Sequence, residues 1–164
     1  MADSSDGKYS RAPELEDLVE LCRRLNKAEV RYILIGGFAV ILHGFVRGTK
    51  DIDLLVDAVP TNVQRIRKAL SYLQDNAVAD VRDDEISRYA VVRVADEIVV
   101  DLMARACGID FAQATTEAGV ETIEIEGVPV PVATKEMLIR MKDTVRPSDA
   151  ADVGYLKARL AEEQ

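Results

Sequence analysis

A short apolar run that ends in two glycines most constrains the fold of this chain. Tyr32–Ile35 has the length and composition of a buried strand, and Gly36-Gly37 indicates a tight turn directly after it. Residues 38–43 then fit a short helix, and residues 51–56 form the next apolar strand. The order strand, glycine turn, helix and strand predicts an α/β or α+β architecture rather than an all-helical or all-strand one.

Further along the chain, helical and strand-like patterns continue to alternate. Apolar residues recur at helical spacing over residues 13–25, 62–74, 135–144 and 149–162. Two hairpins are predicted, one from strands 88–94 and 97–103 and one from strands 121–125 and 128–132. Pro129 and Pro131 favour an edge position for the last strand, because proline cannot donate a backbone hydrogen bond. The charged stretch 75–86 is expected to be an exposed connection, and Thr134 is the expected N-cap of the helix that follows it.

The chain's 164 residues correspond to one domain. Crossovers together with hairpins predict an α/β (α+β) fold with a mixed β-sheet flanked by helices. Three segments are expected within this single domain. They are a flexible tail at 1–12, the core at 13–132, and a C-terminal helical segment at 133–164 that packs on the core as a cap.

Charge and composition exclude several functions. The chain has 29 acidic and 21 basic residues, a net charge of −8, which argues against extended nucleic-acid binding. Cys22 and Cys107 form no disulfide framework and have no metal-ligand spacing. With His43 as its single histidine, the chain is a poor candidate for a zinc site or a Ser–His–Asp hydrolase. No apolar run approaches the roughly 18 residues of a membrane span, so we expect a cytoplasmic protein whose chemistry depends on carboxylates.

Three aspartates are the strongest candidates for that chemistry. Asp51 and Asp53 are two residues apart at the start of a strand, so both side chains point to the same face. Such carboxylates repel each other unless a cation lies between them, and Mg²⁺ suits this role. Asp101 is the only charge within the apolar stretch 98–103, where an isolated carboxylate needs a partner. If the two strands are neighbours, the three acids form a two-metal site for phosphoryl transfer.

Residues just before these acids are suited to binding phosphate. A glycine turn such as Gly36-Gly37 lets backbone N–H groups approach a phosphate closely. Arg47, Thr49 and Lys50 add hydrogen-bond donors and positive charge in the loop that precedes the carboxylates. Each feature also has a simpler interpretation when it is taken alone: the glycine pair is then only a turn, the two acids a solvated strand end, and Lys50 a solvated side chain. Asp101 alone pairs with an arginine such as Arg93 across the hairpin.

The combined pattern resembles the nucleotidyltransferase superfamily that shares the DNA polymerase β fold. Its motif is a glycine pair, a spacer of about ten residues, Asp-h-Asp (h, hydrophobic) and a later third aspartate, here at Gly36, Gly37, Asp51, Asp53 and Asp101. The stretch LIGGFAVILHGFVRGTKDIDLLV looks especially like small bacterial nucleotidyltransferase-like proteins related to abortive-infection toxins. Their weaker downstream motif corresponds here to Ala133, Glu136, Leu138, Ile139, Lys142, Arg146, Asp149 and Asp152.

The resemblance implies transfer of a nucleoside monophosphate from an NTP to a hydroxyl acceptor, with release of pyrophosphate. Asp51, Asp53 and Asp101 would ligate two Mg²⁺ ions, for which Mn²⁺ can substitute, and Asp101 would help to deprotonate the acceptor. Gly36, Gly37, Arg47 and Thr49 would hold the phosphates. Lys142 is a further candidate phosphate contact, and its alternative is an exposed charge on a terminal helix.

The sequence leaves the acceptor open: it is a protein, an RNA or a small molecule. A toxin–antitoxin type of enzyme is one candidate class. The short chain leaves little room for an acceptor-binding domain, so the cap, a second subunit or a partner protein is expected to supply that surface. The alternative function is a non-catalytic nucleotide-binding or antitoxin-like regulatory protein that retains the fold.

Overall fold

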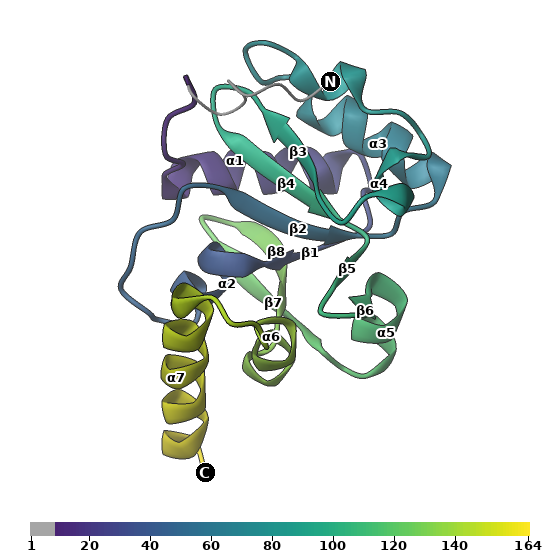
Figure 1. The fold of residues 1–164 in the computed structure, drawn as a ribbon. Helices are drawn as coiled ribbons and strands as arrows, with labels where there is room; N and C mark the ends of the chain where they lie inside the picture. Colours follow the sequence, from purple (N-terminus) through teal and green to yellow (C-terminus); the bar gives the residue numbers. More distant parts are fainter. Residues whose placement is uncertain (1–8) are drawn as a thin grey trace.

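A mixed six-stranded sheet forms the centre of the molecule in the computed structural model, which describes residues 9–164 (Figure 1). The strand order is β3-β4-β2-β1-β8-β7. The strands are β1 (Tyr32–Ile35), β2 (Ile52–Val56), β3 (Val92–Ala95), β4 (Val99–Met103), β7 (Val120–Ile125) and β8 (Val128–Ala133), with a separate ribbon of β5 (Arg105–Ala106) and β6 (Ile109–Asp110). Residues 1–8, most of the predicted tail, lie outside the described residues.

Helices cover this sheet, and two of them follow its last strand at the C-terminal end of the chain. The helices are α1 (Leu15–Lys27), α2 (Gly36–Leu42), α3 (Pro60–Leu70), the 3₁₀ helix η1 (Ala77–Asp80), α4 (Glu85–Arg88), α5 (Phe111–Thr116), α6 (Lys135–Met141) and α7 (Pro147–Glu162). The predicted α/β (α+β) class, with a mixed sheet flanked by helices and a C-terminal helix, is confirmed. No helix of the described chain combines the length and the apolar character needed to cross a membrane.

Helices α1 and α3 lie behind the sheet in Figure 1, whereas α2 lies in front of β1 and β8. Buried apolar residues recur every three to four positions on both helices, namely Leu18, Leu21 and Leu25 of α1 and Val63, Ile66 and Leu70 of α3. This spacing gives each helix one apolar face, which packs into the core. The front of β2 and β4 is therefore the part of the sheet on which polar side chains can gather.

The β3–β4 hairpin is confirmed, but its loop is longer than the predicted pair Ala95-Asp96 and spans 96–98. The buried carboxylate of Asp96 accepts hydrogen bonds from the N–H groups of Asp75 (2.9 Å), Ala77 (2.9 Å) and Glu97 (2.7 Å). This carboxylate ties the hairpin turn to the loop after α3, a function that no turn-residue preference indicates.

The predicted edge position for the proline-containing strand is wrong. β8 lies between β1 and β7, and β7 forms the edge of the sheet. The two prolines are tolerated because the parallel pairing of β8 with β1 is short, with Leu34 opposite Val132. The carbonyl of Pro129 accepts a 2.8 Å hydrogen bond from the Asn26 side chain of α1, so a side chain replaces part of the strand ladder there.

The stretch 75–86 is more structured than the predicted exposed connection. It contains η1 and the start of α4, and Val78 and Ile86 are fully buried. Val78 and Ile86 are too far apart to give a helical or strand periodicity. The charged residues around them therefore made the stretch resemble an exposed loop. The glycine pair also differs from the prediction, because Gly36 and Gly37 form the first turn of α2 instead of a separate turn.

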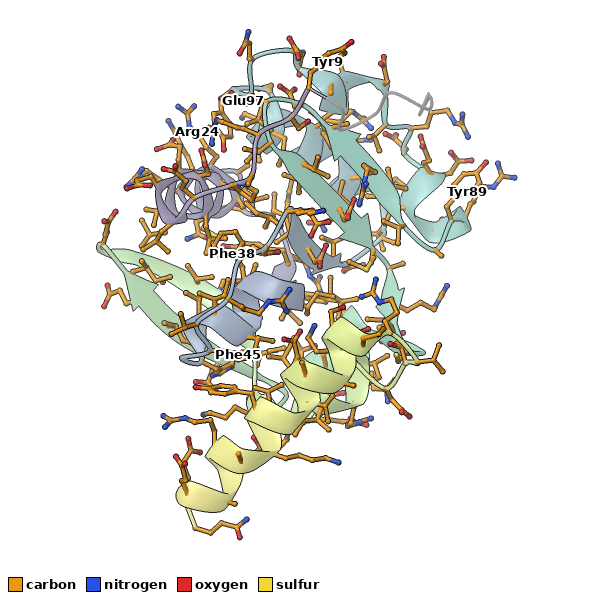
Figure 2. All side chains as sticks on the ribbon, turned by 60° about the vertical axis from the view of Figure 1, so that its left-hand side comes forward. Tyr9, Arg24, Phe38, Phe45, Tyr89 and Glu97 are labelled. Carbon is orange, nitrogen blue, oxygen red and sulfur yellow. The ribbon has the colours of Figure 1, made fainter. Side chains whose placement is uncertain are left out.

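The C-terminal helices pack against α2. Thr134 is the N-cap of α6, as predicted, and its side chain accepts a hydrogen bond from the N–H of Met137. Tyr155 of α7 stacks on Phe45 with the ring centroids 4.6 Å apart, at the position labelled in Figure 2, and its hydroxyl donates to the carbonyl of His43 (3.1 Å). His43 is itself buried, with Nε2 2.9 Å from the carbonyl oxygen of Ala133. The first turns of α7 are thereby fixed beside the front of the sheet.

Candidate active site

Three carboxylates meet on the parallel pair β2–β4. Asp53 lies directly opposite Asp101 in the register, and Asp51 immediately precedes β2. One oxygen from each side chain can be chosen so that all three lie within 4.8 Å of one another. Since Ile52 and Leu54 are completely buried on the other face, the strand alternation forces these acids to the front. The predicted proximity of the three acids is confirmed.

The crowding of these carboxylates changes their acidity. Burial, followed by the negative charges of Asp51 and Asp101, raises the pKa of Asp53 from its ordinary value of 3.8 to about 7. Burial and the nearby Asp101 likewise raise the pKa of Asp51. A site that resists holding three negative charges is stabilised by bringing in a cation. Three oxygen ligands on a rigid strand pair are the donor set that Mg²⁺ or Mn²⁺ accepts, so the residues fit such an ion.

Arg93 provides a cation from within the protein. It lies opposite Asp101 on the adjacent strand β3, and its Nε and Nη2 each donate a 2.9 Å hydrogen bond to the Asp101 carboxylate. Nη2 also lies 3.3 Å from an oxygen of Asp51. The simpler interpretation of Asp101, an ion pair with Arg93 across the hairpin, is therefore correct, and it coexists with the three-carboxylate cluster.

The two glycines allow α2 to begin against these side chains. Gly36 has a φ of +72°, and a Cβ atom added there would lie 2.0 Å from Oδ2 of Asp53. A Cβ atom on Gly37 would lie 2.8 Å from Oγ1 of Thr49. Glycine is thus required at position 36 for both backbone conformation and space. This close approach places the backbone of α2 beside the carboxylates and the hydroxyl of Thr49.

A second charged network connects the loop after α2 to α7. Arg47 donates hydrogen bonds of 2.7 and 2.6 Å to the buried carboxylate of Asp152. The ammonium of Lys142 lies 2.9 Å from Asp152 and 3.4 Å from Asp149, and Arg146 donates to Asp149 at 3.0 Å. Lys142 is 8% exposed, so its alternative interpretation as an exposed charge is wrong. The network fixes several cations near the aspartates.

These groups line one cleft of about 840 Å³. Of the predicted residues, it contains Gly37, Arg47, Thr49, Lys50, Asp51, Asp53, Asp101 and Lys142, with Gly36 directly behind Asp53. It also contains residues that were not predicted as nucleotide or metal ligands, namely Gly48, Val91, Arg93, Met103, Arg146, Ser148, Asp149 and Asp152. Arg146, Asp149 and Asp152 belong to the weaker downstream motif, which could have indicated them. Five basic and five acidic residues face the cleft, a balance that suits a metal-bound polyphosphate.

Comparison with solved structures gives the class of protein. A putative nucleotidyltransferase (TM1012) from Thermotoga maritima aligns with 90% of this chain and 92% of its own length (19% identity, TM-score 0.56). The lincomycin-bound lincosamide antibiotic adenylyltransferase LnuA aligns over 90% and 98% (18% identity, TM-score 0.58). An antigenic nucleotidyltransferase-like protein from Paracoccidioides brasiliensis aligns over 90% and 77% (17% identity, TM-score 0.53). The fold is that of the nucleotidyltransferases.

Sequence comparison identifies the family within that class. Residues 13–154 match the family described as "Nucleotidyltransferase of unknown function (DUF6036)", and the chain belongs to this family. A search of curated proteins found no match. The predicted membership of the nucleotidyltransferase superfamily is confirmed.

Proposed function

We propose that this protein is a Mg²⁺-dependent enzyme that transfers a nucleoside monophosphate from an NTP to a hydroxyl acceptor. The observation that carries the proposal is the cluster of Asp51, Asp53 and Asp101, whose oxygens come within 4.8 Å of one another at the wall of a large cleft. A divalent ion bound there would neutralise charge on the α-phosphate and on the attacking oxygen. Mn²⁺ is expected to substitute for Mg²⁺, because both prefer oxygen ligands.

The reaction forms one bond and breaks one. The acceptor oxygen bonds to the α-phosphorus while the bond from that phosphorus to the bridging oxygen breaks, so pyrophosphate leaves and the nucleoside monophosphate stays on the acceptor. Asp101 takes the acceptor's proton in this proposal. Its carboxylate lines the large cleft beside Asp51 and Asp53, and Arg93 holds its orientation.

The triphosphate is proposed to lie along the side of the cleft formed by α2 and the loop before β2. Gly37 lines this side of the cleft with its backbone, and Thr49 offers a hydroxyl group. Arg47 and Lys142 share the buried carboxylate of Asp152, so their positions are set before any nucleotide binds. Prepositioned charges stabilise a transition state with little reorganisation.

The direct test combines nucleotide binding with group transfer. We expect isothermal titration to show binding of at least one of Mg²⁺-ATP, GTP, CTP and UTP, and the double variant Asp51→Asn/Asp53→Asn to lose it. Asp80→Asn, which removes an exposed acid outside the cleft, is the matched control. Absence of binding by the wild type, or equal binding by the double variant, contradicts the proposal.

Transfer is measured with α-³²P-labelled nucleotide and a panel of protein, RNA and small-molecule acceptors. The lincomycin-bound neighbour justifies including small hydroxyl compounds. A toxin role predicts that induced expression arrests bacterial growth and that the double variant does not. Nucleotide binding with no labelled product, together with a stably copurifying protein, would instead support the antitoxin-like regulatory alternative.

A further inference from the structure

A smaller cleft of about 360 Å³ adjoins the large one. It is lined by Ser10, Arg11, Ala12, Lys50, Asp51, Arg93 and Val99. Lys50, Asp51 and Arg93 line both clefts, so the smaller one opens directly beside the carboxylate cluster. The rest of the smaller cleft is formed mainly by the segment before α1. This segment has no part in the proposed binding of the triphosphate.

That wall is firmly attached to the sheet. The N–H of Arg11 donates a 3.0 Å hydrogen bond to the carbonyl of Glu97, and the hydroxyl of Ser10 donates to the carbonyl of Asp96. The Arg11 guanidinium donates bonds of 2.6 and 2.7 Å to Asp17 of α1. Figure 2 shows Tyr9 and Glu97 at the same end of the molecule, where this segment passes the β3–β4 turn. The cleft is therefore bounded by structure that hydrogen bonds hold in place.

The charge of this cleft differs from that of the whole chain. Its lining contains three basic residues, Arg11, Lys50 and Arg93, and one acidic residue, Asp51, in a protein of net charge −8. Arg11 is paired with Asp17 and Glu97, and Arg93 is paired with Asp101, so Lys50 carries the uncompensated positive charge. The large cleft is balanced. A third cleft, against β3, has two acids and one arginine in its lining, and a fourth, beside α5, has the same ratio. Within residues 9–164 the ammonium of Lys50 has no hydrogen-bond or ion-pair partner, so its charge remains available to a ligand.

The position of the cleft suits an attacking group. In an in-line displacement, the attacking and leaving oxygens lie on opposite sides of the phosphorus. The proposed triphosphate contacts lie on α2, the following loop and α6, near the start of α7. The smaller cleft instead extends from Asp51 toward the β3–β4 hairpin and the segment before α1. Figure 1 shows α7 and that N-terminal segment on opposite sides of β2.

We propose that the smaller cleft is the acceptor subsite and that it binds a phosphate group carried by the hydroxyl acceptor. The inference rests on the proposed function, since it places the acceptor relative to the carboxylates of that site. Lys50 supplies the unpaired charge for the acceptor's phosphate. Arg93, which remains paired with Asp101, lines the same cleft. The bound phosphate is not altered, because the hydroxyl of the same molecule attacks. The same chemistry is present at an RNA terminus and in a small phosphorylated alcohol.

Ala12 provides a selective test. It is exposed, it lines the smaller cleft, and it does not line the large one. Ala12→Glu adds a negative charge, Ala12→Gln adds the same bulk without charge, and Ala12→Lys adds a positive charge. We expect the negative charge to weaken phosphate binding about tenfold relative to the Gln variant, the scale of one charge acting over several ångströms in a partly solvated site. The Lys variant should bind at least as tightly as the Gln variant.

Binding is measured by isothermal titration of the full chain loaded with Mg²⁺ and α,β-methylene-ATP, whose α–β linkage cannot be broken by the transfer. The probes are glycerol 3-phosphate, an RNA trinucleotide with a free 3′-hydroxyl, and glycerol. The subsite is supported if the affinity for either phosphate-containing probe decreases in the order Ala12→Lys, Ala12→Gln, Ala12→Glu. The probe that binds more tightly identifies the source of the phosphate.

Three results overturn the subsite: neither phosphate-containing probe binds to the wild type, glycerol binds as well as glycerol 3-phosphate, or the Glu and Gln variants bind equally. Failure of the proposed function is distinguishable, because it appears as absence of α,β-methylene-ATP binding in the preceding titration. In that case the glycerol 3-phosphate titration is repeated with Mg²⁺ alone, and the dependence on the charge at position 12 decides whether the cleft binds anions.

Discussion

The guanidinium of Arg93 forms two 2.9 Å hydrogen bonds with the carboxylate of Asp101 and reaches within 3.3 Å of Asp51. Two of the three candidate metal ligands are thus already paired with a cation from the neighbouring strand. An ion pair and a metal ion make competing demands on the same oxygens. The arrangement implies that Arg93 holds the aspartates in place and also opposes the binding of a divalent ion.

Replacing Arg93 with glutamine should therefore tighten metal binding. We expect the dissociation constant for Mn²⁺, measured by isothermal titration without nucleotide, to fall about three- to tenfold, the scale of one removed charge near a partly solvated site. Arg88→Gln, which removes an exposed arginine paired with Asp84, should leave the value unchanged. An unchanged or weaker affinity in Arg93→Gln would show that the arginine does not compete with the ion.

Gly36→Ala should damage the site through the backbone. At a φ of +72° any side chain is strained, and the added Cβ atom would collide with Asp53. We expect the free energy of unfolding, measured with urea, to fall by about 1–3 kcal/mol from backbone strain, and further from the collision. Gly154→Ala is the matched control because a Cβ atom there meets nothing within 4 Å, and alanine in helix α7 should stabilise by about 0.5–1 kcal/mol. Equal effects of the two substitutions would contradict this explanation.

The carboxylate cluster was predictable because it depends on two local rules. Alternation along a strand places Asp51 and Asp53 on one face, and the lone charge of Asp101 in an apolar strand demands a partner. The parallel pairing of β2 with β4 brings Asp101 beside Asp51 and Asp53. The sequence pattern is compatible with this pairing but does not predict it. From the sequence, an Arg93–Asp101 ion pair and a cluster of Asp101 with the other two aspartates were competing alternatives. The structure contains both.

Other features could not be predicted because they depend on contacts between distant segments. Asp152 belongs to the downstream motif, but nothing in its local pattern indicates burial, which depends on the pairing with Arg47, 105 positions away. The interior position of β8 depends on the short pairing with β1 and on Asn26, which proline preferences do not reveal. The assignment of roles to the site residues remains a prediction.

The raised pKa of Asp53 predicts an unusual pH dependence for the metal-free protein. Its pKa is about 7 in the folded state and 3.8 is its ordinary value, so the folded state binds more protons between those values. The free energy of unfolding should then fall as the pH rises from about 4 to 7 through this group. Asp51, whose pKa is also raised, acts in the same direction.

Urea unfolding in EDTA at pH 5 and pH 7 measures this effect. Asp53→Asn should reduce the loss of stability between the two pH values, and Asp80→Asn should retain the wild-type difference. Saturating Mn²⁺ should oppose the loss, because it binds the deprotonated carboxylates. The explanation fails if the wild type and Asp53→Asn lose the same stability between pH 5 and pH 7.

Asp152→Asn tests whether the charged network attaches α7 to the rest of the fold. The wild-type carboxylate is 1% exposed and pairs with Arg47 at 2.6 Å and with Lys142 at 2.9 Å. Removing its charge leaves the buried ammonium of Lys142 with only the longer contact to Asp149, at 3.4 Å. We expect a loss of about 2–4 kcal/mol in the free energy of unfolding, slightly below the usual cost of breaking a buried pair because the amide keeps some hydrogen bonding.

The matched control lies on the same helix. Glu162→Gln removes one partner of the exposed 3.1 Å ion pair with Arg159, and such pairs contribute less than about 1 kcal/mol. Amide hydrogen exchange should quicken along the first turns of α7 in Asp152→Asn and stay unchanged in Glu162→Gln, because Asp152 joins this helix to the loop before β2 and Glu162 does not. Equal exchange in the two variants would mean that the Tyr155–Phe45 stack, rather than the charges beside the cleft, holds α7 in place.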